Sequence, residues 1–207
     1  MCSFVSAALR QTEQLESGTK NTNHKNGFPG RALLGPLCVS APRVPLAAGN
    51  MEVKPLHIVL VEPEIPPNTG SIARLCGATD TVLDLVHPLG FSIDDKHLKR
   101  AGLDYWPYVT IRNWDSLESF LAATDERDIF FFTTKVEMPH YQARFHPGSH
   151  LIFGKETRGL PEEIIALYAD RCYTIPMTND RIRSLNLAMC AGIVLYEALR
   201  QTVSIRK

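Results

Sequence analysis

Residues 56–79, LHIVLVEPEIPPNTGSIARLCGAT, join a continuous apolar run to a stretch whose apolar side chains recur at helical spacing. Residues 56–61 predict a strand, because a short and mainly apolar run is typical of a strand in a parallel sheet. Two prolines precede Asn68, which we expect to be the N-cap of a helix with Ile72 and Cys76 on its buried face. The stretch therefore predicts a strand followed by a helix, the repeating unit of an α/β fold.

The same alternation continues to the end of the chain. We expect further strands at residues 82–86, 108–111, 129–133, 151–154 and 172–175, and helices at 94–101, 116–123, 161–168 and 185–201. Strands that alternate with helices predict an α/β fold with a mainly parallel sheet flanked by helices. The last helix is apolar over more than one narrow stripe, which is typical of a helix buried on two sides. One side would face the sheet and the other a second subunit.

Residues 1–50 differ from the rest in composition. They are rich in Ser, Thr, Asn, Gly and Pro and have no sustained helical or strand period. We therefore expect a disordered N-terminal extension at 1–50 and one folded domain at 51–207. We also hypothesise that Met51 is the biological start of the protein. The N-terminus has no basic region followed by a long apolar stretch, so we expect no secretion signal.

Composition limits the possible partners. The 22 basic and 22 acidic residues cancel, so nucleic-acid binding would need local basic clusters rather than overall charge. The five cysteines form no CxxC pair and no metal-ligand spacing with histidine. We expect them to be reduced thiols that pack as small hydrophobic side chains, in a cytoplasmic protein without a metal. No apolar run is long enough to predict a membrane span.

Three polar segments lie where predicted strands end or predicted helices begin: 68–70 with Arg74, 153–161 and 183–186. Ligands of open α/β sheets bind at the carboxyl ends of strands, where backbone amides and helix N-termini point outward. The segments therefore predict a binding site. Gly154-Lys155 is not part of a phosphate-binding P-loop, because that motif requires Ser or Thr after the lysine and Glu156 stands there.

Four segments, 62–70, 100–105, 153–161 and 184–187, resemble the SPOUT methyltransferases, and most closely their tRNA (cytidine/uridine wobble) 2′-O-methyltransferase branch. The resemblance covers residues 56–202. It implies an α/β domain with a C-terminal deep trefoil knot that holds S-adenosylmethionine in a bent pose. It also implies a homodimer with each site near the subunit interface, in agreement with the two-sided last helix.

The resemblance also implies roles for individual residues. It places the cofactor against Phe132, Thr133, Gly154, Glu156, Gly159, Ile175, Met177 and Ser184. It implies catalytic roles for Arg74, Glu156, Ser184 and Asn186. It implies RNA contacts at the first motif, for Asn68 and Arg74. Local basic clusters in the sequence, rather than the resemblance, favour phosphate contacts for Lys99, Arg158 and Arg183.

The reaction requires alignment of a ribose hydroxyl with the methyl group and stabilisation of developing negative charge on oxygen. Because a guanidinium stays protonated, Arg74 is assigned electrostatic positioning rather than general-base work. By residue type alone, Arg74 and Glu156 equally suit a solvated surface, and Ser184 and Asn186 equally suit helix caps.

The implied activity is S-adenosylmethionine-dependent methylation of the ribose 2′-hydroxyl of the wobble nucleotide, cytidine or uridine, in the tRNA anticodon loop. Two alternatives stay open: 2′-O-methylation of ribosomal RNA, and an RNA-binding module that keeps the fold without catalysis. The cofactor contacts of residues 178–182 and the choice between cytidine and uridine also stay open.

Overall fold

The computed structural model describes residues 54–92 and 103–202, with the backbone alone at 103–105. Within these ranges six strands form a sheet in which every pairing is parallel and the order is β3-β2-β1-β5-β4-β6. The strands are β1 (His57–Val61), β2 (Val82–Val86), β3 (Ile111–Trp114), β4 (Ile129–Phe132), β5 (His150–Phe153) and β6 (Cys172–Tyr173). The expected parallel sheet is confirmed.

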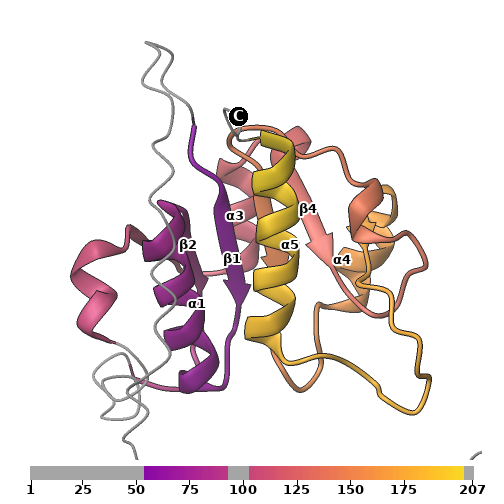
Figure 1. Ribbon diagram of the computed structural model, residues 1–207, viewed down its shortest axis with the longest axis horizontal. Coiled ribbons are helices and arrows are strands. Elements are labelled where there is room, and N and C mark those ends of the chain that lie inside the picture. Colours follow the sequence, from indigo (N-terminus) through magenta and orange to yellow (C-terminus); the bar gives the residue numbers. More distant parts are fainter. Residues whose placement is uncertain (1–53, 93–102, 203–207) are drawn as a thin grey trace, which may run out of the picture. The chain divides into compact units, whose positions relative to one another are not determined.

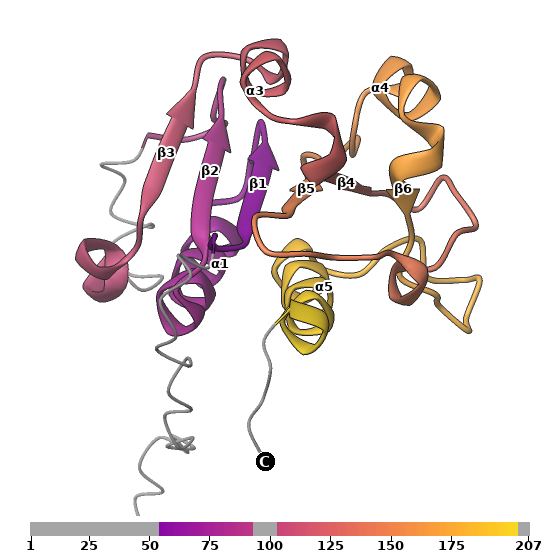
Figure 2. The ribbon, with the colours of Figure 1, turned by 90° about the horizontal axis from the view of Figure 1, so that it is seen from above.

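Helices cover both faces of the sheet, as Figure 1 and Figure 2 show. The helices α1 (Pro66–Thr79) and α5 (Leu187–Thr202) lie on one face, and α3 (Leu117–Ala123) and α4 (Glu162–Leu167) on the other. Short 3-10 turns complete the described elements: η1 (Leu103–Tyr108), η2 (Glu126–Asp128), η3 (His140–Gln142) and η4 (Ala169–Arg171). The central strands are therefore buried on both sides, which accounts for their mostly apolar sequences, in which His57 and Asp84 are exceptions.

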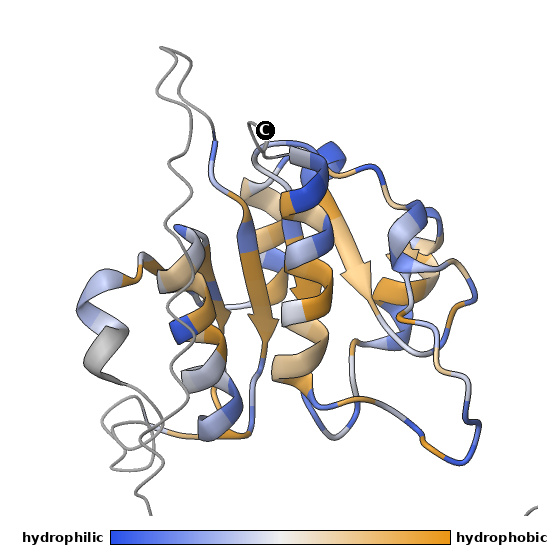
Figure 3. Ribbon diagram, in the orientation of Figure 1, coloured by the Kyte–Doolittle hydropathy of each residue, from blue (hydrophilic) through white to orange (hydrophobic). Residues whose placement is uncertain are grey.

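Two hydrophobic clusters form the core, one on each face of the sheet. Alternate residues of β1 divide between them: Ile58 and Leu60 pack under α1 and α5, whereas Val59 and Val61 pack under α3 and α4. Figure 3 shows hydrophobic colours along β1 and β4 and mostly hydrophilic colours along the loop that leads into α5. Among the described residues, no helix combines the length and apolarity needed to cross a membrane.

The order of the strands creates a point where the direction of winding changes. From β1 the chain proceeds outward to β2 and β3, and then crosses to β4 in the other half of the sheet. The strand β5 inserts between β1 and β4, and β6 adds to the far edge. Loops that leave neighbouring strands in opposite directions open a crevice at their carboxyl ends, where ligands of such sheets bind.

Several predicted boundaries were wrong. The strand predicted at 108–111 begins only at Ile111, because the preceding residues form η1 with Pro107 inside it and the β3 register starts with Ile111 beside Leu83. Asn68 is not an N-cap: α1 begins at Pro66, and Ile65 is its N-cap without a side-chain hydrogen bond. Pro161 is an N-cap rather than the first helical residue. The helix predicted at 94–101 lies outside the described residues.

The described cysteines pack as the small hydrophobic side chains that the sequence predicts. Cys76 and Cys172 are free and buried, and Cys190 is free and half-buried. Burial raises the pKa of Cys76 to about 12 and that of Cys172 to about 11. These thiols stay protonated at neutral pH and pack as hydrophobic side chains.

Candidate active site

A cavity of about 530 Å³ lies at the carboxyl ends of β4, β5 and β6, beside the N-termini of α1 and α5. Four stretches of chain line it: the start of α1, the residues after β4, the residues after β5, and the segment between β6 and α5. Its volume falls within the range of about 300–1,000 Å³ that is usual for small-molecule sites. The lining mixes backbone and apolar surface from Phe132, Ile175 and Leu187 with polar groups.

The loop after β5 is held in a tight turn that only glycine allows at Gly154. A Cβ atom added there would lie 2.2 Å from the carbonyl carbon of Gly159 and 2.3 Å from the nitrogen of Leu160. The amide of Gly159 donates to the carbonyl oxygen of Lys155 at 2.8 Å, and Gly159 has a φ of 71°, a conformation that favours glycine. Glycine is therefore required at position 154 because the backbone of Gly159 and Leu160 packs closely against it.

Glu156 ties this loop to the start of α1. Its carboxylate accepts hydrogen bonds from the backbone amides of Glu64 (2.9 Å) and Ile65 (3.3 Å), and from Asn68 Nδ2 (2.9 Å). Pro66 and Pro67 at the start of α1 have no amide hydrogen, and the amides of Asn68 and Thr69 donate to the carbonyl oxygen of Ile65. The carboxylate therefore binds the two amides just before the first helical residue, where its negative charge is favourable at the positive end of the helix.

Asn68 and Asn186 extend the bond network to α5. Asn186 Oδ1 accepts from the backbone amides of Ala188 (2.9 Å) and Met189 (3.4 Å), so it caps α5. Its Nδ2 is then free to donate, and it donates to Asn68 Oδ1 at 2.9 Å. Asn68 in turn donates to Glu156. The three side chains form a relay, Asn186 to Asn68 to Glu156, in which every donor points toward the carboxylate.

Two acidic residues that the sequence analysis left without a role also brace the loop. Glu64 Oε2 accepts from Thr157 Oγ1 at 2.7 Å and from the Thr157 amide at 3.3 Å. Lys155 Nζ forms an ion pair with Glu62 Oε2 at 2.5 Å. Both acids belong to the segment 62–70 that carried the family resemblance. Their pairing with 155–157 could not be read from spacing, because more than 90 residues separate the partners.

The structure brings all the predicted cofactor residues to the cavity. Phe132, Thr133, Gly154, Glu156, Gly159, Ile175, Met177 and Ser184 all line it. Of the predicted catalytic residues, Glu156, Ser184 and Asn186 line it as well, whereas Arg74 is an exposed residue of α1 that does not. The relay gives Asn186 the expected cap, while the structure shows no such cap for Ser184 at the start of α5, which begins at Leu187.

The predicted RNA-binding residues divide into two groups. Arg158 and Arg183 line the cavity and are exposed, so they can meet a phosphate at its mouth. Asn68 lines the cavity but is buried, and its amide is engaged by Glu156 and Asn186, which gives it a positioning role. Lys99 lies outside the described residues.

Comparison with known proteins identifies relatives of this chain. Residues 55–196 match the family described as the SpoU rRNA Methylase family. A protein of Escherichia coli strain K12, named tRNA (cytidine(34)-2'-O)-methyltransferase, is 46% identical over 147 residues, which cover 70% of this chain and 93% of that protein.

Solved structures agree with this match. One, described as "Structural insights into the 2-OH methylation of C/U34 on tRNA", is 47% identical with a TM-score of 0.66 and covers 72% of this chain and 96% of its own. The SpoU methyltransferase AviRb from Streptomyces viridochromogenes, solved with AdoMet, is 24% identical with a TM-score of 0.61, covers 73% of this chain and 62% of its own, and shows a shared fold. Since the family match spans most of the folded residues, the chain belongs to the SpoU methylase family.

Proposed function

We propose that this chain transfers the methyl group of S-adenosylmethionine to the ribose 2′-hydroxyl of the wobble nucleotide, cytidine or uridine, in tRNA anticodon loops. The observation that carries the proposal is the convergence of three distant segments, 62–68, 153–159 and 175–187, on one cavity. The relatives named for methylation at position 34 supply the substrate class. We assign the activity to residues 51–207, and we propose a cytoplasmic location, which is compatible with a tRNA substrate.

The cavity fits the cofactor by its volume and by its mixed lining. Phe132, Ile175 and Met177 offer apolar surface for the adenosine, and the backbone of the loop at Gly154 offers amides and carbonyls. S-adenosylmethionine supplies a methyl group activated by its sulfonium. Glu156 has hydrogen bonds to three donors, so it holds the site in shape and does not act as a general base.

The acceptor nucleotide would be held from the mouth of the cavity. Arg158 and Arg183 are exposed there and suit phosphate contacts, which fix the register of the RNA. The attacking ribose oxygen develops a bond to the methyl carbon while the bond from carbon to sulfur breaks, and the hydroxyl proton passes to solvent water. Arg74 stabilises the negative charge that develops on the ribose oxygen. The proposal gives a metal ion no part in this reaction.

We further propose that the functional unit is a homodimer and that Arg74 acts in the cavity of the second subunit. Met189, Ile193 and Tyr196 follow one another at helical spacing along α5 and are 59%, 38% and 60% exposed. A helix with this outer face, beside a buried face of Ala191, Val194 and Leu195, suits packing on two sides. Arg74 does not line the cavity of its own subunit. In the proposed dimer it therefore acts in the cavity of the neighbouring subunit.

We also propose that the C-terminal segment forms the deep trefoil knot. The chain leaves β6 at the sheet edge, lines the cavity with Ile175 and Met177, and returns to α5, which packs against α1 and β5 in the middle of the domain. The loop 153–159 lies against the same cavity. In the proposed knot, the segment between β6 and α5 passes through a loop of the chain at this position. Knotted connections of this kind are rare in proteins.

The test is methylation by the full chain with labelled S-adenosylmethionine, using total tRNA and ribosomal RNA from a strain that lacks this modification. We expect label at position 34 of tRNA, mapped by nuclease digestion. Label confined to ribosomal RNA would favour the rRNA alternative and refute the proposal. Cofactor binding without label in either RNA would favour the non-catalytic alternative.

The dimer is tested by complementation between two inactive variants. Arg74→Ala is expected to bind the cofactor but not to turn over, and Asn186→Ala to lose cofactor affinity. If Arg74 acts across the interface, mixing the two restores activity, because one site in the mixed dimer holds both intact groups. Absence of recovery, together with mixed dimers seen by native mass spectrometry, would refute action in trans.

A further inference from the structure

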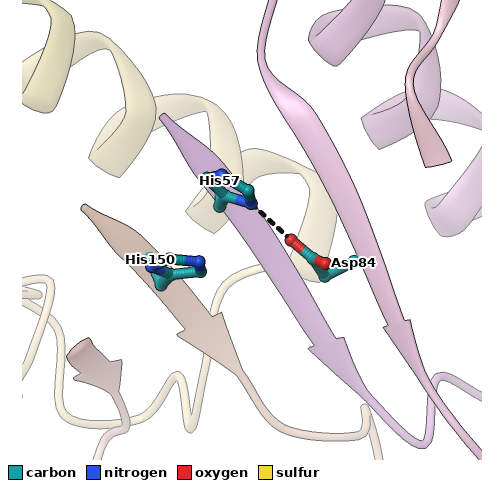
Figure 4. A group of neighbouring side chains, drawn as sticks. All are labelled: His57, Asp84 and His150. Carbon is teal, nitrogen blue, oxygen red and sulfur yellow. Dashed lines mark hydrogen bonds and ion pairs between the residues drawn. The ribbon is translucent and has the colours of Figure 1, made fainter. Parts of the chain in front are cut away.

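A second cluster of polar side chains lies toward the amino ends of the central strands, whereas the cavity lies at the carboxyl ends. His57 and His150 are the first residues of β1 and β5, which pair side by side, and Asp84 lies on the neighbouring β2 (Figure 4). The side chains of His57 and Asp84 are 7% and 1% exposed, and His150 is half-buried. The cavity lies at the carboxyl ends of the strands, so the cluster is no part of the methyl-transfer site.

The three side chains converge on one another. His57 Nδ1 lies 2.6 Å from Asp84 Oδ2, the two imidazole rings stack with centroids 4.1 Å apart, and one candidate ligand atom from each residue lies within 4.8 Å of the others. The Nδ1 atom of His150 is buried without a hydrogen-bond partner. Buried polar atoms nearly always have a partner, so an orphan here needs an explanation.

We propose that His57, Asp84 and His150 bind one divalent transition-metal cation of the zinc class, at a site with three protein ligands that joins β1, β2 and β5. Two imidazoles and one carboxylate are ligands that Zn²⁺ and similar borderline cations favour, with the remaining position left to water. The cation takes the place of the proton shared by His57 and Asp84. It also gives a second imidazole nitrogen a partner.

Binding requires the side chains to rearrange, because the candidate ligand atoms are brought only within 4.8 Å of one another and the two imidazole rings are stacked. Tetrahedral ligands about 2.0–2.1 Å from a metal lie roughly 3.4 Å apart, so the contact between His57 and Asp84 lengthens while His150 turns inward. Asp84 is already oriented, because its other oxygen accepts from Trp114 Nε1 at 2.8 Å. Such outer hydrogen bonds are usual for carboxylate ligands of metals. Half-buried His150 leaves a route for entry.

Neighbouring groups are compatible with a cation. Phe120 of α3 packs edge-on against His150 with ring centroids 5.6 Å apart and shields the site from that side. Arg112 lies beside Asp84 in the β3 register, but it is exposed, so water and salt screen its charge. The spacing of cysteine and histidine in the sequence predicts no metal site, because these ligands come from three different strands.

The test is metal binding by the full chain after removal of metal with a chelator. We expect one Zn²⁺ per chain by calorimetry, and Co²⁺ in its place to give the visible absorption of a low-symmetry, four-coordinate ion. At a free Zn²⁺ concentration 100 times the dissociation constant, the melting temperature should rise by about 5–10 °C. Absence of binding by the native chain would overturn the proposal.

Variants distinguish this cluster from other metal-binding groups of the chain. His150→Phe keeps an aromatic ring against Phe120 and removes the orphan nitrogen, and Asp84→Asn keeps an acceptor for Trp114. Each should weaken Zn²⁺ binding at least about 100-fold while the metal-free fold, checked by circular dichroism, persists. His146→Gln, a histidine outside the cluster, should bind as the native chain does. Unchanged binding in both His150→Phe and Asp84→Asn would overturn the proposal.

Discussion

Replacing Glu156 by glutamine tests whether its carboxylate organises the cavity. The carboxylate has two acceptor oxygens: Oε2 serves the Glu64 amide, and Oε1 serves the Ile65 amide and Asn68 Nδ2. Glutamine keeps one oxygen and places an NH₂ group where the other was, so at least one donor faces a donor. Asn68 cannot relieve the clash by flipping, because its Oδ1 is needed by Asn186, whose own oxygen caps α5.

The magnitude follows from these bonds. With the glutamine oxygen placed at Oε1, the Glu64 amide is left without a partner, which costs about 1–3 kcal/mol. The two remaining bonds lose the charge of the acceptor, which lowers each by about 1 kcal/mol at most, and less for the exposed Ile65 amide. The organised cavity is therefore destabilised by about 2–4 kcal/mol, shared between folding and cofactor binding.

Urea unfolding and calorimetry with S-adenosylhomocysteine measure the two shares. For Glu156→Gln we expect their sum to reach about 2 kcal/mol or more, with cofactor affinity down at least about tenfold. Glu137→Gln, an exposed glutamate of the same chemistry, is the matched control and should change neither value. If Glu156→Gln matched that control in both measurements, the carboxylate would not hold the cavity together.

Two further substitutions test the cavity, and a change of pH tests the histidine cluster. Gly154→Ala would place a Cβ atom 2.2 Å from Gly159, so we expect the free energy of unfolding in urea to fall by at least about 2 kcal/mol and little cofactor to bind. The control is Gly192→Ala, which should fold normally because the nearest side chain lies 4.0 Å from the added Cβ atom. Asn186→Ser keeps a helix cap but is too short to reach Asn68, so its unfolding free energy should change by less than about 0.5 kcal/mol while calorimetry shows weaker cofactor binding. Burial, followed by the charge of His57, lowers the pKa of His150 from 6.5 to about 4. Above pH 6.5 the ring is neutral in both the folded and the unfolded chain, so its contribution to stability is fully present. As the pH falls toward 4, up to about 3 kcal/mol of the free energy of unfolding is lost. Urea unfolding of metal-free protein over that range should show the loss, and His150→Phe should lack it.

Most strands were predictable because parallel strands covered on both faces are apolar along most of their length. Residues 82–86 matched β2 without error, and 129–133 and 151–154 matched β4 and β5 to within one residue at each end. The strand at 108–111 failed because its start is set by pairing with β2 rather than by local propensity. The paired residues lie far apart in the sequence, so no local pattern shows where β3 begins.

The sequence predicted the position of the site on the sheet better than it predicted the contacts within the site. Polar segments at the ends of predicted strands led to the correct edge of the sheet, because parallel strands share that edge. The bonds from Glu62 and Glu64 to the loop after β5 depend on loop conformation and leave no periodic trace. The family resemblance supplied most of the residues that line the cavity, and Arg74 is the one predicted catalytic residue that the described structure places elsewhere.

The two interpretations of Asn186, helix cap and site residue, turn out to depend on one another. Because Oδ1 is fixed by the amides at the start of α5, the amide can present only its NH₂ group to Asn68, and this sets the direction of the whole relay. Aspartate caps a helix as well as asparagine does, yet Asn186→Asp would face the Asn68 oxygen with a second acceptor and add a negative charge near Glu156. Residues that are equivalent for the helix are therefore not equivalent for the cavity, and Asn186→Asp should leave α5 intact while it weakens the binding of the cofactor.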